Sequence, residues 1–323
     1  MGKTDPKSDT HPDADIAAFL SHLEGDRGAS PNTLRNYTQA LREFYDWYQS
    51  QRSKEPHWAT LQPYDFRAWL RDLGSRGLSR SAIHLRFSAL RTFYKHLIRL
   101  SRAEKSPLKG IVLPKPEKRL PKFLTVQQMI DLLEAPLAEF KKRQISDREK
   151  NQITDPAPYF RDVAILETIY SCGMRVSELC QLRADDIDWS QKIVRVLGKG
   201  NKERLIPIGE PALDAINAYW DSLTTPPQGA SPAFLANQKN QRAIYPRLIQ
   251  LRLKTYLESA GLDPAITPHK LRHSYATPML DAGANLRSVQ ELLGHAHLVT
   301  TQIYTHITPE RLKSAYDKAH PRA

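Results

Sequence analysis

The chain has 323 residues, with 47 Lys or Arg against 35 Asp or Glu, so its formal net charge is +12 at pH 7. This length favours two domains over one, each large enough to bury a core of its own. The positive charge favours a polyanionic partner, and nucleic acid is preferred to a membrane because the sequence has no long apolar run and no amphipathic anchor. The competing interpretation of the charge is solubility alone.

The N-terminus and the cysteines indicate where the protein works. Residues 1–12 contain almost no apolar side chains, so we expect a disordered tail. The stretch from Met1 to Asp15 lacks the apolar segment of an export signal, and Cys172 and Cys180 do not form a spaced ligand set. We therefore expect reduced, buried thiols in a cytoplasmic protein, associated with the nucleoid if its partner is DNA.

Helices are predicted throughout the N-terminal part. Ser30 followed by a proline is typical of a helix start, and apolar residues then recur at helical spacing up to Tyr48. A second helix is expected around Phe66, and a third runs from Ser79 to about Leu100. This part of the chain is therefore predicted to be a helical domain.

The third of these helices separates its charges from its apolar face. Between Asp72 and Glu104 the sequence has no acidic residue but seven Lys or Arg. A solvated helix normally alternates charge signs, so this pattern favours contact with DNA phosphates or insertion in a major groove. The residues expected to bind DNA from this helix are Arg80, Arg86, Arg91, Lys95 and Arg99.

An interdomain linker is predicted at 103–122, where four prolines stand among lysines. Thr125 then fits the N-cap of a helix that continues to about Leu133. The polar stretch 141–154 that follows is interpreted as a mobile insertion, and the sequence assigns it no role.

The C-terminal part combines helices with a β-hairpin. A helix over 159–171 is predicted to end at Gly173. Apolar residues on either side of Gly198–Asn201 predict antiparallel strands within 187–207, with Lys199 at the hairpin tip. The remainder is expected to be mostly helical, so the fold class is mainly α with a small antiparallel β-sheet.

Six residues in order along the chain carry the candidate chemistry. They are Arg175, Lys199, His269, Arg272, His295 and Tyr304. A phenol has a pKa of ~10, so a tyrosine nucleophile needs nearby cations that favour the phenolate. Guanidinium groups bind phosphate oxygens bidentately and keep their charge, which makes Arg175 and Arg272 the expected phosphate clamp. The competing interpretation is that Arg175 merely pairs with Glu178 or Asp162, worth ~0.5 kcal/mol at a surface.

Proton transfer can be assigned to other members of the series. Thr267 and the proline after it predict a helix start that places His269 in the first turn, where unpaired N–H groups favour an anion, with Arg272 on the same face. His269 is the candidate general base, since histidine titrates near neutrality. Lys199 is the candidate general acid for the oxygen that leaves phosphorus. Lys202 is a rival for that role and a further candidate DNA contact.

The ordered Arg, Lys, His-x-x-Arg, His, Tyr series, with the local sequence around each member, resembles the tyrosine recombinases and is most similar to the Xer-type enzymes. The resemblance extends from about Ile16 to the end of the chain. It implies a clamp around DNA, made of a helical core-binding domain with a SAM-like fold at 13–102 and a mixed α/β catalytic domain at 123–308. It also implies that a C-terminal helix within 309–323 docks into a neighbouring subunit.

The resemblance also implies a reaction. Tyr304 attacks the scissile phosphate and leaves a 3′-phosphotyrosyl link and a free 5′ hydroxyl, while His295 donates a hydrogen bond to a phosphate oxygen. Each step exchanges one phosphoester for another, so neither a metal nor a cofactor is expected. The implied task is the resolution of chromosome dimers at a dif-like site on double-stranded DNA. Four protomers, of this chain alone or with a paralogous Xer recombinase, would act together and be activated by the septal DNA translocase.

Three other interpretations stay open. Five histidines from His269 to His306 suggest a zinc enzyme, although the interleaved Arg272 would repel a cation. A DNA-binding architectural protein without catalysis would carry the same basic helix, and a phage or mobile-element integrase of the same family would carry the same series. One residue departs from the family pattern, because Pro278 stands where histidine is common; we expect it to bend its helix.

Overall fold

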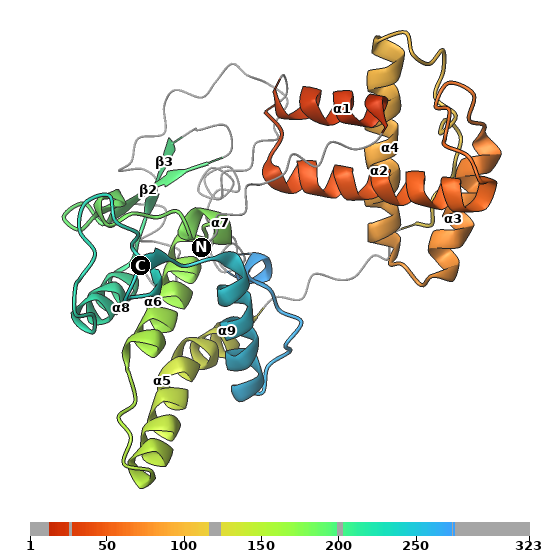
Figure 1. The fold of residues 1–323 in the computed structure, drawn as a ribbon. Coiled ribbons are helices and arrows are strands. Elements are labelled where there is room, and N and C mark those ends of the chain that lie inside the picture. Colours follow the sequence, from red (N-terminus) through yellow and green to blue (C-terminus); the bar gives the residue numbers. More distant parts are fainter. Residues whose placement is uncertain (1–12, 26–27, 116–123, 199–202, 273, 275–323) are drawn as a thin grey trace, which may run out of the picture. The chain divides into compact units, whose positions relative to one another are not determined.

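The computed structural model describes residues 13–25, 28–115, 124–198, 203–272 and 274 (Figure 1). The chain divides into two compact units, Met1–Arg119 and Leu120–Ala323, each with a hydrophobic core of its own. Of the helices in the described ranges, none has both the length and the apolar character that a membrane span requires.

The N-terminal unit is helical, and side-chain caps mark where its helices begin. In the described part of the unit they are α1 (Ala14–Glu24), α2 (Pro31–Arg52), α3 (Pro63–Ser75) and α4 (Arg80–Arg99). The side chains of Ser30 and Ser79 each accept an N–H of the first turn, which confirms the predicted starts of α2 and α4. Asp13 caps α1 in the same way.

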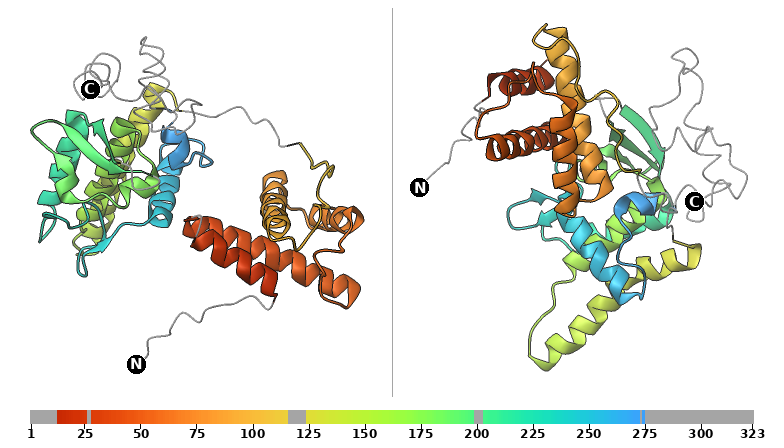
Figure 2. Two further views of the ribbon diagram at one scale, coloured as in Figure 1. Left: turned by 90° about the horizontal axis from the view of Figure 1, so that it is seen from above. Right: turned by 90° about the vertical axis from the view of Figure 1, so that its right-hand side faces the viewer.

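Aromatic side chains form much of the core of this unit. Helices α1 and α2 lie side by side and α4 crosses them (Figures 1 and 2). Phe44 of α2 stacks on Phe66 of α3 with ring centroids 4.9 Å apart, and it meets Trp69 edge to face at 5.1 Å. All three rings are fully buried, so their packing fixes α2 against α3.

The predicted linker, 103–122, starts too early. Four of its apolar side chains are buried in the N-terminal core: Ala103, Leu108, Ile111 and Leu113. Side chains of α4 also bind its backbone, since Arg91, His84 and Arg80 hydrogen-bond to the carbonyls of residues 111, 114 and 115. We call residues 103–115 the strap. Its composition resembles a linker, but the apolar residues between its prolines bury enough surface to anchor it.

Helix α6 (Ala157–Cys172) is the centre of the C-terminal unit. Most of its side chains are buried, and it contacts α5 (Val126–Glu149), α7 (Val176–Leu179) and α8 (Glu210–Asp221). Helix α9 (Pro246–Ser259) packs against α5 and α7. The series of candidate catalytic residues therefore begins, at Arg175, on elements that pack around one buried helix.

Helix α5 is longer than predicted. It continues through Pro136 and includes most of the stretch 141–154, which we had expected to be a mobile insertion. Phe140 packs against Tyr159 and Phe160 at the start of α6, with ring centroids 5.3 and 6.1 Å apart. These contacts pack α5 against the start of α6, and residues 141–149 of the stretch are helical.

A small antiparallel sheet follows α7, and a short 3₁₀ helix (Ala184–Asp186) leads into it. Its strands, in order, are β1 (Ile187–Asp188), β2 (Ile193–Leu197) and β3 (Glu203–Pro207). The register pairs Val196 with Arg204, so β2 and β3 form the predicted hairpin, whose tip at 199–202 lies outside the described residues. A second pair, β4 (Leu235–Asn237) with β5 (Arg242–Ala243), was not predicted, because strands this short show no alternation.

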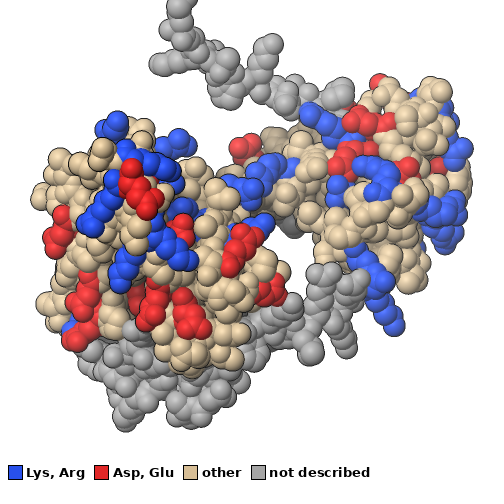
Figure 3. Space-filling view, turned by 90° about the horizontal axis from the view of Figure 1, so that it is seen from below, with Lys and Arg blue, Asp and Glu red and all other residues tan. Residues whose placement is uncertain are grey.

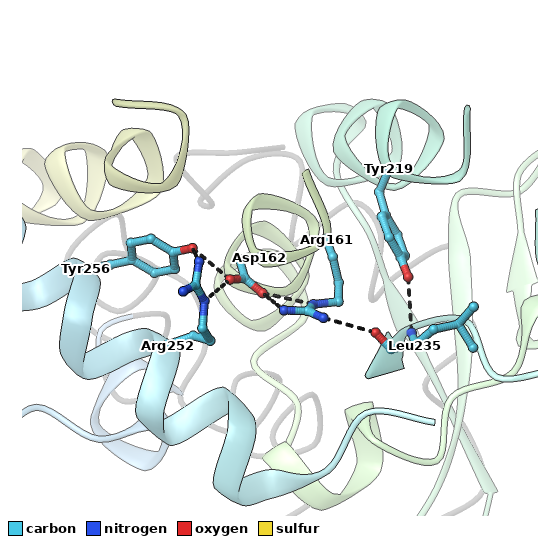
Figure 4. Close-up of polar contacts among 6 residues, drawn as sticks. All are labelled: Arg161, Asp162, Tyr219, Leu235, Arg252 and Tyr256. Carbon is cyan, nitrogen blue, oxygen red and sulfur yellow. Dashed lines mark hydrogen bonds and ion pairs between the residues drawn. The ribbon is translucent and has the colours of Figure 1, made fainter. Parts of the chain in front are cut away.

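A buried polar network joins α6 to α9 and to β4 (Figure 4). Asp162 Oδ1 accepts hydrogen bonds from Nε and Nη2 of Arg161 at 2.9 and 2.8 Å. Its Oδ2 accepts from Arg252 Nε at 2.5 Å and from the Tyr256 hydroxyl at 2.7 Å. Arg161 Nη1 also donates to the Leu235 carbonyl at 3.2 Å. One buried carboxylate thus balances two arginines from different helices.

Candidate active site

The loop between α6 and α7 is built around a left-handed turn. Gly173 ends α6 with a φ of 55°, and its N–H bonds to the carbonyl of Ile169 at 2.9 Å, which confirms the predicted cap. Arg175 then forms the N-cap of α7 with an extended backbone. The glycine therefore ends α6 just before the first arginine of the series.

The second arginine of the series reaches the same loop. Residues 268–272 are helical, and two N–H groups of this segment bond to the Thr267 carbonyl, so the helix begins where predicted. Arg272 is 3% exposed, and its Nη1 donates to the Gly173 carbonyl at 2.7 Å, across 99 positions of sequence. The structure thereby brings the Arg272 segment against the loop that carries Arg175, as a two-arginine phosphate clamp requires.

Arg175 itself is held by Glu178. The backbone N–H of Arg175 donates to Oε2 of Glu178 at 2.7 Å, and its Nη1 donates to Oε1 at 2.8 Å. The contact named by the competing interpretation is therefore present, whereas the contacts of Asp162 described above are with other residues. The Arg175 side chain is 42% exposed, whereas that of Glu178 is only 5% exposed, so the pair joins a partly exposed guanidinium to a buried carboxylate.

Sequence reasoning missed Arg204, which is the second partner of Glu178. From β3, its Nη1 and Nη2 donate to Oε1 and Oε2 of Glu178, both at 2.9 Å. Burial alone would raise the pKa of Glu178, but hydrogen bonds from Arg204 and from the Arg175 N–H outweigh it and lower the pKa to about 2. The spacing of Arg175 and Glu178 signals a capping contact, but no spacing signals a pair that joins a helix to a strand.

The other members of the series are placed only in part. His269 is exposed in the same helical segment in which Arg272 is buried, so the two side chains differ in accessibility. Outside the described residues lie Lys199, Lys202, His295, Tyr304, Pro278 and the histidines after His269 on which the zinc alternative depends. The catalytic roles of all these residues stay predictions.

The basic residues of α4 mostly have partners within their own unit. Arg86 donates to both carboxylate oxygens of Glu43, at 2.6 and 2.8 Å, so its charge is already compensated. Arg80 and Arg91 bind carbonyls of the strap, whereas Lys95 is exposed. A count of positive charges therefore overstates how many of these side chains are poised to bind phosphates. The DNA contacts of these side chains stay predictions. For Arg86, the ion pair with Glu43 argues against such a contact.

Arg99 has histidine partners instead. Its Nη2 lies 2.9 Å from Nε2 of His22 and 3.3 Å from Nδ1 of His96, which joins α4 to α1. Burial, the neighbouring His22 and Arg99 lower the pKa of His96, so the ring accepts from the arginine as a neutral group.

On the face drawn in Figure 3, acidic side chains lie among the basic ones.

Comparison with known proteins identifies the family. Residues 16–100 match the N-terminal SAM-like domain of phage integrases, and residues 140–311 match the phage integrase family. The tyrosine recombinase XerC of Alcanivorax borkumensis is 39% identical over 308 residues, which cover 95% of this chain and 94% of the relative. The XerC of Pelotomaculum thermopropionicum is 39% identical over 323 residues, 95% of this chain and 98% of the relative.

Solved structures share the fold. The Tn1549 transposon integrase in complex with circular intermediate DNA has a TM-score of 0.66 at 18% identity, over 93% of this chain and 98% of the other. The XerH recombinase bound to a palindromic difH substrate has a TM-score of 0.63 at 21% identity, over 95% and 89%. Taken with the matches in sequence, these findings show that the chain belongs to the phage integrase family and is a tyrosine recombinase of the Xer type, an enzyme that cuts and rejoins DNA.

Proposed function

We propose that this chain resolves chromosome dimers by site-specific recombination at a dif-like site, through a 3′-phosphotyrosyl intermediate on Tyr304. The observation that carries the proposal is the hydrogen bond from Arg272 to the Gly173 carbonyl, because it joins the two arginine segments. The 39% identity to a protein named XerC, over 95% of the chain, supports chromosome dimers as the substrate.

The reaction needs an in-line nucleophile and charge stabilisation on the non-bridging oxygens. Arg175 and Arg272 supply that charge as bidentate donors. The phenolate oxygen of Tyr304 forms a bond to phosphorus while the bond from phosphorus to the 5′ oxygen breaks. The phosphotyrosyl link replaces one phosphoester bond by another and so conserves the bond energy. A 5′ hydroxyl of another strand can therefore displace the tyrosine without an external energy source.

Proton transfers accompany both steps. His269 takes the proton of the phenol, and its exposed position in the helical segment supports access to a substrate group. Lys199 protonates the departing 5′ oxygen, with Lys202 as the rival for this role, and His295 donates a hydrogen bond to a non-bridging oxygen. Each of these groups acts on an atom whose charge changes in the transition state.

We further propose that four protomers act on two DNA sites. They are copies of this chain alone or include a paralogous Xer recombinase, and the segment 309–323 of each docks into its neighbour. Activation by the septal DNA translocase would limit the reaction to cell division. The structure of XerH bound to a difH substrate supports a dif-like DNA, whereas the fold shared with the Tn1549 integrase supports the mobile-element alternative.

The test uses a duplex that carries a dif-like site and a nick close to the scissile phosphate, so that the released fragment diffuses away and the covalent adduct accumulates. We expect wild type to give an adduct on a denaturing gel, with or without EDTA, and Tyr304→Phe to give none. Tyr245→Phe removes a hydroxyl from a half-exposed tyrosine of the same unit and should leave the adduct unchanged.

The alternatives predict other results. An adduct or activity lost on addition of EDTA would support the zinc enzyme. Binding of the same DNA without any adduct would support the architectural protein. An adduct formed on the end of a mobile element but not on a dif-like site would support the integrase.

A further inference from the structure

Glu178 binds two arginines that differ in how they are held. Arg204 grips both carboxylate oxygens with its two terminal nitrogens at 2.9 Å, and the side chains of Glu178 and Arg204 are 5% and 17% exposed. Arg175 uses Nη1 on Oε1 alone, in addition to its backbone N–H, and its side chain is much more exposed. Arg204 is therefore the fixed partner of the carboxylate, and the Arg175 guanidinium is the one that can leave.

Departure of Arg175 has a consequence for Glu178. A phosphate clamp requires the Arg175 guanidinium to turn its donors from the carboxylate to the DNA. If Arg175 were the only cation at Glu178, each turn towards phosphate would leave a buried carboxylate without a counterion, which is strongly unfavourable. The carboxylate would then compete with the phosphate for the same guanidinium.

Arg204 is well placed to prevent this competition. It lies on β3 opposite Val196 of β2, and Ile206, two residues further along the strand, is fully buried, so the strand holds the arginine in register. The lowered pKa of Glu178 agrees with a carboxylate that stays ionised between two cations.

We propose that Arg204 is a positioning residue for DNA cleavage: it keeps Glu178 paired and ionised while Arg175 turns to the scissile phosphate. This inference rests on the proposed function, since it assumes that Arg175 binds that phosphate. Arg204 touches neither the nucleophile nor the phosphate in this scheme. Its contribution is to lower the cost of releasing Arg175.

The test is the rate of adduct formation in a single turnover with saturating nicked DNA. Arg204→Met is expected to slow the rate by about tenfold or more, which corresponds to about 1.4 kcal/mol in the barrier. Arg204→Met combined with Glu178→Gln should recover most of the lost rate, because a neutral amide needs no counterion. The unpaired carboxylate of Arg204→Met would also destabilise the fold, and Glu178→Gln would relieve that defect too, so thermal unfolding must show that Arg204→Met is folded at the assay temperature.

A matched control stands on the neighbouring strand. Arg195 of β2 pairs with Asp186 at 3.0 Å and is about half exposed, so Arg195→Met removes a similar side chain without touching Glu178. Its cleavage rate should equal that of wild type. Arg204→Lys keeps one charge but loses the two-pronged grip, so its rate should lie between those of wild type and Arg204→Met.

A second substrate tests whether Arg204 acts through Arg175 or through the lysine of the β2–β3 hairpin, Lys199. With sulfur in place of the bridging 5′ oxygen, the leaving group departs as a thiolate and needs no proton from the hairpin lysine. If Arg204 acts through Arg175, Arg204→Met stays slow on this substrate as well.

Three results would overturn the inference. They are a wild-type rate for Arg204→Met, a double variant as slow as Arg204→Met, and full recovery on the sulfur substrate, which would assign Arg204 to the hairpin instead. The absence of any adduct from wild type would count against the proposed function itself, so the two failures are distinguishable.

Discussion

Replacing Asp162 by asparagine removes a negative charge from the buried network of Figure 4 with almost no change in size. Arg161 and Arg252 then lose their shared counterion, and their side chains are only 8% and 27% exposed, so water replaces it poorly. Removal of one partner from a buried ion pair costs about 3–5 kcal/mol. Arg161 keeps the Leu235 carbonyl as an acceptor and Arg252 is partly hydrated, so we expect the lower end, about 3 kcal/mol.

The assay must resolve the two units, because one unfolding free energy is defined only for a two-state transition. Hydrogen exchange of backbone amides in α6 and α9 reports on the C-terminal unit, and exchange in α2 and α4 reports on the N-terminal unit. The slowest amides of α6 and α9 should lose about 3 kcal/mol of protection in Asp162→Asn. Those of α2 and α4 should not change.

The control is Lys254→Gln, on the same helix as Arg252. Lys254 pairs with Glu258 at 3.6 Å and both side chains are exposed, so its loss should change protection by less than about 0.5 kcal/mol. A loss below about 1 kcal/mol in Asp162→Asn, or an equal loss in both units, would show that the network does not carry the stability assigned to it.

Four further predictions concern the site and the DNA contacts. The pKa of Glu178 is lowered from about 4.5 to about 2, so its ionised form stabilises the fold fully above about pH 4.5. This stabilisation is lost progressively as the pH falls to about 2. The difference in unfolding free energy between wild type and Glu178→Gln should therefore shrink between about pH 4.5 and about pH 2. Gly173→Ala should destabilise the C-terminal unit by about 1–2 kcal/mol, measured by hydrogen exchange of the α6 amides, because the φ of Gly173 is 55°. Lys95→Gln should lower the slope of log affinity against log salt by about 0.9, whereas Arg86→Met should lower the stability of the N-terminal unit and leave that slope unchanged. Deleting residues 309–323 should reduce adduct formation, and unchanged cleavage would remove the proposed role of that segment.

Local signals in the sequence located the ends of helices well. Ser30 and Thr125 were predicted as N-caps and Ser79 as the start of a helix, and each accepts an N–H of the first turn with its side chain. Gly173 was predicted as a C-cap and has the left-handed backbone of one. These features depend on residues within one turn of each other, so a single sequence contains all the information they need.

Features that depend on distant contacts were not predictable in this way. Helix α5 continues through Pro136 because Phe140 finds aromatic partners at the start of α6, and tertiary packing of this kind overrides local propensity. The pairing of Arg204 with Glu178 crosses 26 positions and joins a strand to a helix. No periodicity in the sequence indicates either contact.

The chemistry was predictable as a set of residue types and less so as geometry. Arg175 and Arg272 were expected to form a phosphate clamp, which stays a prediction, and the bond from Arg272 to the Gly173 carbonyl brings their two segments together. The charge pattern of α4 indicated a basic face but could not show that Arg86 is already bound to Glu43. A charge count records which side chains are cationic, whereas the structure shows which of them already have a counterion.

The strap changes where this recombinase can be divided. A fragment that ends at Arg102 lacks Leu108, Ile111 and Leu113, three side chains that close the N-terminal core, and would present the apolar surface beneath them to water. A fragment that ends at Lys115 keeps them, together with the carbonyls that the side chains of α4 bind. The N-terminal module to be transferred, for chimaeras between recombinases or for isolated study, therefore extends thirteen residues beyond the last residue of the predicted domain.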